Sequence, residues 1–260
     1  MNIESYLKRI GYAGRVEATH EALTSLHLAH MQTIPFENID IPLRVPITLD
    51  FEKIFEKIVG RNRGGFCYEL NGLFGWLLNE IGFEVEMLSA RVFRGDGQLS
   101  PEFSHMLLRV NKDHIADVGF GDSFTRPLMF DEIEQKQETG GYRLTQEGGT
   151  WQMERRLDGS WMPQYLFTVE RRGFDEFEEM CRFQQTSPES VFTRKVVCSK
   201  ATPAGRLTFA NGRFITTNTG LKTESGIESA AELKSLLFTH FGFELDDGYD
   251  RLLQIKESAA

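Results

Sequence analysis

The sequence predicts an α+β protein in which helices come first and an antiparallel sheet or small barrel follows. Three observations predict this order. Apolar residues recur at steps of three and four up to Gly82, and after Gly82 they alternate at a period of two. The final third mixes both periods. With 260 residues, 40% of them hydrophobic, the chain is long enough to bury a sizeable core.

The first third contains three predicted helices with separate start and stop signals. We expect them over residues 19–34, 50–60 and 67–82. Thr19 and Asp50 are candidate N-caps, because their side chains can accept a hydrogen bond from a free N–H in the first turn. Pro35 and Gly82 stop the first and third helices.

The rest of the chain is predicted to alternate strands with two further helices. Strands are expected over 84–93, 105–111, 114–120, 142–146, 151–157, 161–169, 206–210 and 213–218, and helices over 174–183 and 230–241. Asp158-Gly159 and Asn211-Gly212 are typical of two-residue hairpin turns. Changes of period near 83 and 190 divide the chain into regions 1–83, 84–190 and 191–260.

The composition argues against several classes of protein. A net charge of −9 argues against general nucleic-acid binding. No apolar run approaches the roughly 18 residues of a membrane span, and the N-terminus lacks a signal-peptide stretch. The three cysteines, Cys67, Cys181 and Cys198, form an odd, sparse set without a metal-binding pattern. We therefore expect a cytoplasmic protein that has no metal site, with Cys181 and Cys198 structural.

The stretch 61-RNRGGFCYELNGLF-74 places Cys67 at the first turn of the third predicted helix. Unpaired N–H groups and the helix dipole favour a negative charge there, and Arg61 and Arg63 add positive charge. Gly64-Gly65 allows a sharp turn and close approach of a ligand. These features favour a thiol with a lowered pKa that acts as a nucleophile. The alternative is a small core residue.

A nucleophilic cysteine needs a base, and the base needs an orienting group. The segment 105-HMLLRVNKDHIADVGFG-121 is a predicted strand–turn–strand. His105 begins its first strand, and His114 begins its second strand just after the turn. We prefer His105 as the base, because His114 lies next to the turn, where solvent exposure is expected. The other histidines are expected on polar faces or at boundaries of helices: His20, His27, His30 and His240.

Asp117 is predicted to share a strand face with His105. If the turn centres on Asn111, the two residues are directly opposed, with Cβ atoms about 5 Å apart; if it centres on Lys112, they are diagonal neighbours at about 7–8 Å. A buried aspartate needs a partner such as a histidine N–H. The alternatives are that Asp117 caps the following loop or that Asp122 orients the base. A cysteine, histidine and aspartate in this arrangement support acyl transfer through a thioester.

Five segments resemble, in order, the signature segments of the arylamine N-acetyltransferases. They are 34-IPFENIDI-41, the segment RGGFCYELNGLF around Cys67, 104-SHMLLRV-110, 116-ADVGFG-121, and 184-QQTSPESVF-192 with Cys198 and 203-PAGRLTF-209. The resemblance covers residues from about 5 to 245. It implies a three-part fold with a cysteine-protease-like core: a helical bundle (1–83), a β-barrel with a connecting helical segment (84–190) and an α/β lid (191–260).

The resemblance also implies a reaction. Cys67 would be the nucleophile, His105 the base and Asp117 the orienting group. Acetyl-CoA would acetylate the cysteine, and an arylamine, arylhydroxylamine or hydrazine would then take the acetyl group in a ping-pong scheme. The role that the resemblance implies is xenobiotic metabolism. The implied partners are these small molecules and no metal, and the oligomeric state stays open.

Substrate contacts are assigned by position in the matching segments. The expected aromatic wall for the amine is Phe36, Phe93 and Phe120, each of which can equally be a core residue. The expected CoA contacts are Phe103, Ser104, Phe183, Ser187 and Ser190. The alternative for the last three is that 185-QTSPES-190 only forms a turn between a helix and a strand.

Two other classes of function are compatible with the same residues. One is a Cys–His–Asp hydrolase or transglutaminase-like enzyme that works without acetyl-CoA. The other is a non-catalytic redox-sensing protein in which Cys67 is the reactive thiol. A redox sensor would not need the histidine or the aspartate, whereas an acyltransferase should lose turnover without either.

Overall fold

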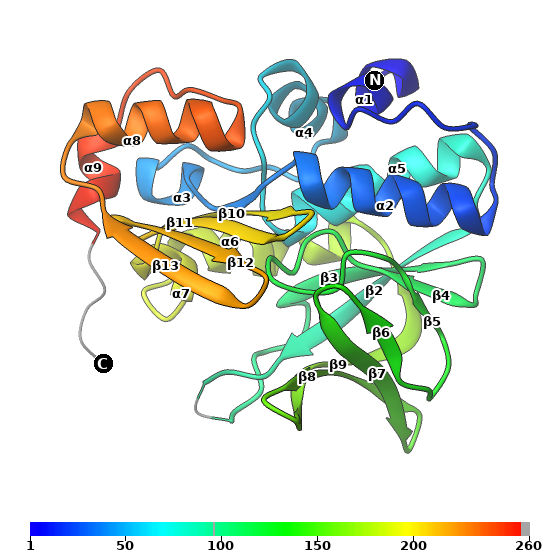
Figure 1. Cartoon of the computed structure of the whole chain (residues 1–260). Helices are drawn as coiled ribbons and strands as arrows, with labels where there is room; N and C mark the ends of the chain where they lie inside the picture. Colours follow the sequence, from blue (N-terminus) through cyan, green and yellow to red (C-terminus); the bar gives the residue numbers. More distant parts are fainter. Residues whose placement is uncertain (96, 256–260) are drawn as a thin grey trace.

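The computed structural model describes residues 1–95 and 97–255. The first third of the chain is helical (Figure 1). Its helices are α1 (Ile3–Arg9), α2 (His20–Thr33), α3 (Asp40–Leu43), α4 (Phe51–Phe55), a π-helical turn (Glu56–Gly60) and α5 (Cys67–Ile81). Thr19 and Asp50 accept hydrogen bonds from first-turn N–H groups, and Gly82 ends α5 with a φ of 108°. All three predicted helices are therefore confirmed, with α1 and α3 in addition.

The middle third forms an eight-stranded antiparallel sheet that is nearly closed into a barrel (Figure 1). Its strands are β2 (Val85–Val92), β3 (His105–Val110), β4 (His114–Ala116), β5 (Leu128–Met129), β6 (Gln135–Gln137), β7 (Gly140–Glu147), β8 (Thr150–Leu157) and β9 (Ser160–Arg172). The strand order is β5-β4-β3-β2-β9-β8-β7-β6. The Gln135 side-chain amide joins the two edges, accepting from Met129 N at 2.7 Å and donating to Met129 O at 2.9 Å.

The C-terminal part is a five-stranded sheet with its own helices. A 3₁₀ turn (Asp175–Phe177), α6 (Glu178–Thr186) and α7 (Val191–Arg194) lead to β10 (Val197–Thr202), β11 (Gly205–Ala210), β12 (Arg213–Asn218), β13 (Leu221–Gly226), α8 (Ala230–Leu236), a π-helical turn (Leu237–Phe241) and α9 (Tyr249–Gln254). Helix α9 follows the last helix predicted from the sequence, 230–241, and was not predicted. The hairpin at Asn211-Gly212 is confirmed by the pairing of Ala210 with Arg213.

The five-stranded sheet also includes a strand from the first third. β1 (Phe36–Glu37) pairs with β10 and forms one edge, so the strand order is β1-β10-β11-β12-β13. The signature segment 34–41 thus lies between the helical region and the C-terminal sheet. The region boundaries at 83/84 and 190/191 stay predictions.

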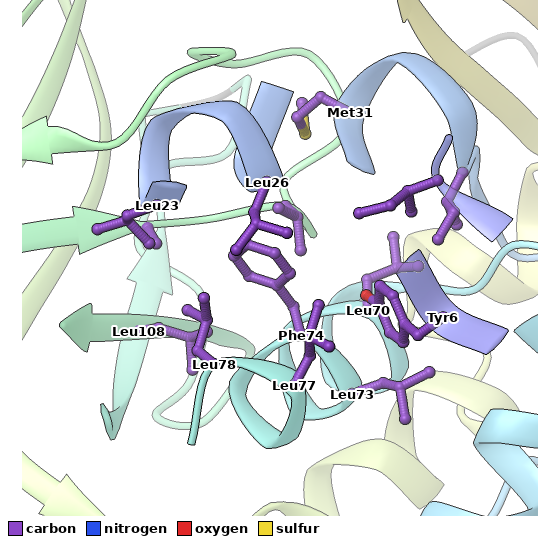
Figure 2. Packing of buried hydrophobic residues seen from close by; sticks show 14 of the residues in the cluster. Tyr6, Leu23, Leu26, Met31, Leu70, Leu73, Phe74, Leu77, Leu78 and Leu108 are labelled. Carbon is purple, nitrogen blue, oxygen red and sulfur yellow. The ribbon is translucent and has the colours of Figure 1, made fainter. Parts of the chain in front are cut away.

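Helix α5 lies at the centre of the largest apolar core (Figure 2). Its side chains Leu70, Phe74 and Leu77 are buried against residues of α1 and α2, among them Tyr6 and Leu26. Burying one such side chain contributes about 1.5–3 kcal/mol relative to leaving it exposed. The first turn of α5 is therefore held firmly, and the position of Cys67 is fixed with it.

Two features are absent from the part of the chain that the structure describes. No helix over 1–95 and 97–255 is long and apolar enough to cross a membrane. In the same ranges, no three His, Cys, Asp or Glu side chains are grouped in a way that could hold a metal ion.

Candidate active site

The segment before Cys67 is fixed by its backbone contacts with β1. Gly65 forms a parallel bridge with Phe36, and Glu37 N donates to Gly65 O at 2.8 Å. A Cβ added at Gly64 would lie 2.0 Å from Pro35 O, so only glycine fits there. We had expected Gly64-Gly65 to allow a ligand to approach. The structure corrects this expectation, because Pro35 and Glu37 fill the space beside Gly64 and the Glu69 side chain fills the space beside Gly65.

The two arginines before Cys67 are paired with carboxylates. Arg63 Nη2 lies 2.8 Å from both Glu37 Oε1 and Asp40 Oδ1. Lys57 Nζ lies 2.8 Å from Asp40 Oδ2 and from Glu69 Oε1. We call these five residues, Glu37, Asp40, Lys57, Arg63 and Glu69, the charge cluster. The exposed Arg61 pairs with Asp246 at 3.4 Å. The expected role of the arginines in activating the thiol is therefore wrong.

The burial of Cys67 opposes the expected lowering of its thiol pKa. Burial raises the pKa of the Cys67 thiol, and the neighbouring Asp117 and Cys181 raise it further. The Met106 and Tyr68 N–H groups lower the pKa but do not offset the burial. In the free protein the neutral thiol is favoured, so Cys67 needs a partner to take its proton.

His105 and Asp117 approach each other as the second of the two predicted registers requires. Val110 pairs with His114 and Leu108 with Ala116, so the turn centres on Lys112. His105 Nε2 lies 2.8 Å from Asp117 Oδ2, and both residues are buried. The expected strand over 114–120 ends at Ala116, which leaves Asp117 at the start of a loop. The predicted His105–Asp117 approach is confirmed.

The surroundings of Asp117 determine which nitrogen of His105 is basic. Burial alone would raise the pKa of Asp117, but His105, Asn71 and the Gly119 N–H together hold it below its ordinary value. The ionised carboxylate can only accept a hydrogen bond, so His105 Nε2 carries the proton. His105 Nδ1 is then the nitrogen with a free lone pair. Asn71 Nδ2 supports the carboxylate at 2.9 Å.

The other candidates for base and orienting group lie elsewhere. His114, expected at the surface, is buried and lies 2.6 Å from Asp113 Oδ1 and 2.8 Å from His20 Nδ1. The Asp122 side chain is 57% exposed and pairs with two arginines of the barrel and the C-terminal sheet. His27 and His30 are fully buried and not at a polar boundary. Their surroundings were missed because α2 packs against β10 and against the loop that follows β4.

Cys67 and His105 line one pocket of about 710 Å³. All three predicted aromatic residues, Phe36, Phe93 and Phe120, line it as well. The Phe120 ring stands edge-on to the His105 ring with centroids 5.1 Å apart. A thiol, a histidine and aromatic walls around one cavity suit covalent chemistry on a flat apolar substrate.

The predicted CoA residues separate into two groups. Ser104, Phe183 and Ser190 line the pocket. Phe103 and Ser187 are not among its lining residues: the Phe103 ring packs on Phe177, with centroids 5.2 Å apart, and Ser187 O accepts from Thr193 Oγ1 in a turn.

Four residues near the site were missed at the sequence level. They are Asn71, Arg94, Tyr165 and Arg194. Arg94 and Arg194 line the pocket, and the Tyr165 ring lies 5.4 Å from the His105 ring. An asparagine on the buried face of a helix is a signal that could have found Asn71. Tyr165 reaches the site only through pairing of β9 with β2, which no local pattern predicts.

Comparisons with known proteins agree over nearly the whole chain. A family model described as N-acetyltransferase matches residues 19–249. Arylamine N-acetyltransferase of Mycolicibacterium smegmatis is 34% identical over 98% of this chain and 97% of its own length. The solved arylamine N-acetyltransferase from Salmonella typhimurium is 34% identical, with a TM-score of 0.90 over 97% of each chain. The Mycobacterium marinum arylamine N-acetyltransferase in complex with CoA is 28% identical, with a TM-score of 0.91 over 98% of this chain and all of its own.

Proposed function

The chain belongs to the arylamine N-acetyltransferase family, and from this membership we propose that it moves an acetyl group from acetyl-CoA to an aromatic amine through acetyl-Cys67. The observation that carries the proposal is that Cys67 and His105 line one pocket while His105 Nε2 lies 2.8 Å from Asp117 Oδ2. Acetyl-CoA is the co-substrate of this family, in agreement with a relative solved in complex with CoA.

In the first half-reaction the Cys67 sulfur attacks the acetyl carbonyl carbon of acetyl-CoA. Its proton passes to His105 Nδ1, because burial keeps the thiol protonated until a base accepts the proton. The new bond joins acetyl carbon and Cys67 sulfur, the bond to the CoA sulfur breaks, and the proton leaves with CoA as its thiol. Asp117 stabilises the imidazolium. The Cys67 backbone N–H, in the first turn of α5, is a candidate donor to the oxyanion.

In the second half-reaction an amine nitrogen attacks the acetyl carbon of acetyl-Cys67. His105 Nδ1 takes the proton from the nitrogen and returns it to the Cys67 sulfur as the thioester bond breaks. The products are the acetylated amine and the free thiol. Dividing the transfer into two steps through one nucleophile gives ping-pong kinetics.

The pocket lining supports aromatic acceptors and a charged donor. Phe36, Phe93 and Phe120 offer faces and edges for an arylamine, arylhydroxylamine or aromatic hydrazine of the kind met in xenobiotic metabolism. The proposed CoA contacts are Ser104, Phe183 and Ser190, which line the pocket. Phe103 and Ser187 do not line it and are no longer proposed as contacts. We add Arg94 and Arg194, which bring positive charge to the same pocket for the CoA phosphates. Three free cysteines support a reducing, cytoplasmic location.

The test is the mass of the intact protein after brief exposure to acetyl-CoA without acceptor. We expect one acetyl group on Cys67, which an aromatic amine or hydrazine then removes. Cys67→Ala should take up none. Cys198→Ser, which changes a buried thiol in β10, should still be acetylated. An unmodified wild-type protein whose Cys67 thiol is shown to be free would refute the acetyl-cysteine intermediate.

The two other classes of function are distinguished by amide cleavage and by the surroundings of Cys67. A hydrolase on this core would cleave amide substrates without acetyl-CoA. A redox-sensing thiol is disfavoured because such thiols combine a low pKa with solvent access, whereas Cys67 is buried and its pKa is raised.

A further inference from the structure

His27 of α2 is a fully buried histidine that holds both ends of the loop 117–125. Its Nδ1 lies 2.8 Å from Thr125 O, and Asp117 N lies 3.1 Å from its Nε2. The exposed fraction of His27 is 0%. The loop between these two contacts begins with Asp117 and carries Phe120, which lines the pocket beside His105.

The two contacts allow a single protonation state. A carbonyl oxygen only accepts, so His27 Nδ1 donates to Thr125 O. The Asp117 N–H only donates, so Nε2 accepts and carries no proton. Burial lowers the pKa of His27 to about 4, while Thr125 O and Asp117 act in the opposite direction. The neutral imidazole therefore fits this place with both nitrogens satisfied.

Packing leaves His27 little freedom to move. Its ring stacks on Phe124, with centroids 5.7 Å apart, and meets Phe74 of α5 edge-on at 5.9 Å. Asn71 of α5 accepts from Val118 N at 2.9 Å, one residue beyond the His27 contact. Two adjacent backbone N–H groups at the start of the loop are thus fixed from two different helices.

We propose that His27 is a positioning residue that fixes the Asp117 backbone, and through it the Asp117 carboxylate, against His105. The proposal rests on the function proposed above. His105 loses reactivity when its orienting carboxylate moves, because a displacement of about 1 Å in such a group can cost up to about 100-fold in rate. His27 touches no substrate atom, so its effect passes entirely through the loop.

Three substitutions separate the two contacts of His27. The amide of His27→Gln reaches the place of Nε2 and can accept from Asp117 N. The amide of His27→Asn is one carbon shorter, reaches the place of Nδ1 and retains only the donation to Thr125 O. His27→Phe keeps the ring and loses both hydrogen bonds. His30→Phe is the matched control, because His30 is equally buried on α2 but contacts Tyr6 Oη at 2.8 Å instead of the loop.

The readouts are kcat and KM for acetyl transfer, the rate of Cys67 alkylation by iodoacetamide, and the unfolding temperature. We expect His27→Phe and His27→Asn to lower kcat and the alkylation rate by about 10–100-fold, with acceptor KM changed less than about threefold. His27→Gln should recover most of the rate. His30→Phe should lower the unfolding temperature as His27→Phe does, with kcat nearly unchanged.

Three results would overturn the proposal: equal rates for His27→Gln and His27→Asn, a normal rate for His27→Phe, or an equal kcat loss in His30→Phe. If His27→Phe does not fold, the comparison of Gln with Asn still decides. Alkylation of Cys67 needs no acetyl-CoA. It therefore tests His27 even if the acetyl-cysteine intermediate is refuted.

Discussion

Two groups of buried titratable residues flank the first turn of α5, and they differ in what is left unpaired. In the charge cluster, Lys57 contacts Asp40 and Glu69, and Arg63 contacts Glu37 and Asp40. In the other group, Cys67, His105 and Asp117, only the histidine and the aspartate are paired with each other. The thiol and the imidazole line a pocket of about 710 Å³.

The pKa shifts of the two groups follow from this difference. Burial lowers the pKa of Lys57, but Glu69, Glu37 and Asp40 outweigh it and hold the pKa above its ordinary value. Burial raises the pKa of Cys67, and no cation offsets it. Removing one member of a buried set of paired charges is costly, because its partners are left buried and unpaired. The thiol and the imidazole instead line a pocket where a substrate can reach them. Burial and charge alone therefore do not identify a catalytic site.

The largest effect is expected from breaking the catalytic group. Asp117→Asn should lower kcat by about 10³–10⁴-fold, because the amide favours the wrong histidine tautomer. The unfolding temperature should change little, since Asn is similar in size and still forms hydrogen bonds. Steady-state kinetics and calorimetry measure the two quantities. A loss of less than tenfold would show that Asp117 does not orient His105.

Breaking the charge cluster should affect stability and leave the chemistry intact. Arg63 is 4% exposed, and Arg63→Met removes the guanidinium that Glu37 and Asp40 share, which leaves Lys57 as their remaining cation. We expect a loss of about 3–5 kcal/mol in the free energy of unfolding. Urea titration measures it, and kcat per folded molecule should remain near the wild-type value. Arg61→Met, which removes an exposed pair, is the control and should change neither.

Acid should destabilise the protein through its buried neutral histidines. Burial lowers the pKa of His27 to about 4 and that of His30 well below its ordinary value. The unfolded chain therefore binds more protons below about pH 6.5, and stability falls as pH falls from there towards 4. His27 alone should cost about 2 kcal/mol between pH 7.5 and pH 5.

Urea titrations at the two pH values measure this dependence. His27→Gln is the control, because glutamine does not titrate and should remove the share of His27. A wild-type stability that is flat between pH 7.5 and pH 5 would mean that these histidines are not held neutral. Asp117, whose pKa is lowered, adds stability above about pH 3.8 that is lost only in stronger acid.

The smallest effect is expected from a third charged group, which is centred on Asp122 of the loop 117–125. Asp122 lies 3.1 Å from Arg155 of β8 and 3.1 Å from Arg206 of β11. Because its side chain is more than half exposed, Asp122→Asn should change kcat/KM by less than about threefold. A loss comparable to that of Asp117→Asn would instead make Asp122 the orienting carboxylate, the alternative that the sequence left open.

Local patterns were sufficient for the predicted helices and for the approach of His105 to Asp117. The third predicted helix begins at Cys67 and ends at Gly82 because its apolar spacing and its terminal glycine act within a few residues. His105 and Asp117 come together because they flank one short hairpin, whose geometry is fixed by the turn. The two-residue turns at Asp158-Gly159 and Asn211-Gly212 are local in the same sense.

Only the tertiary structure decided what surrounds those residues. The segment 61-RNRGG-65 suggested an activated thiol. In the structure, however, Arg63 forms ion pairs with Glu37 and Asp40, and the two glycines pack against Pro35 and Glu69. His27 and Tyr165 reach the site from α2 and β9, across 90 and 48 residues from Asp117. The physical reason is that charge pairing and burial depend on packing between distant segments. A local sequence period carries no information about those partners.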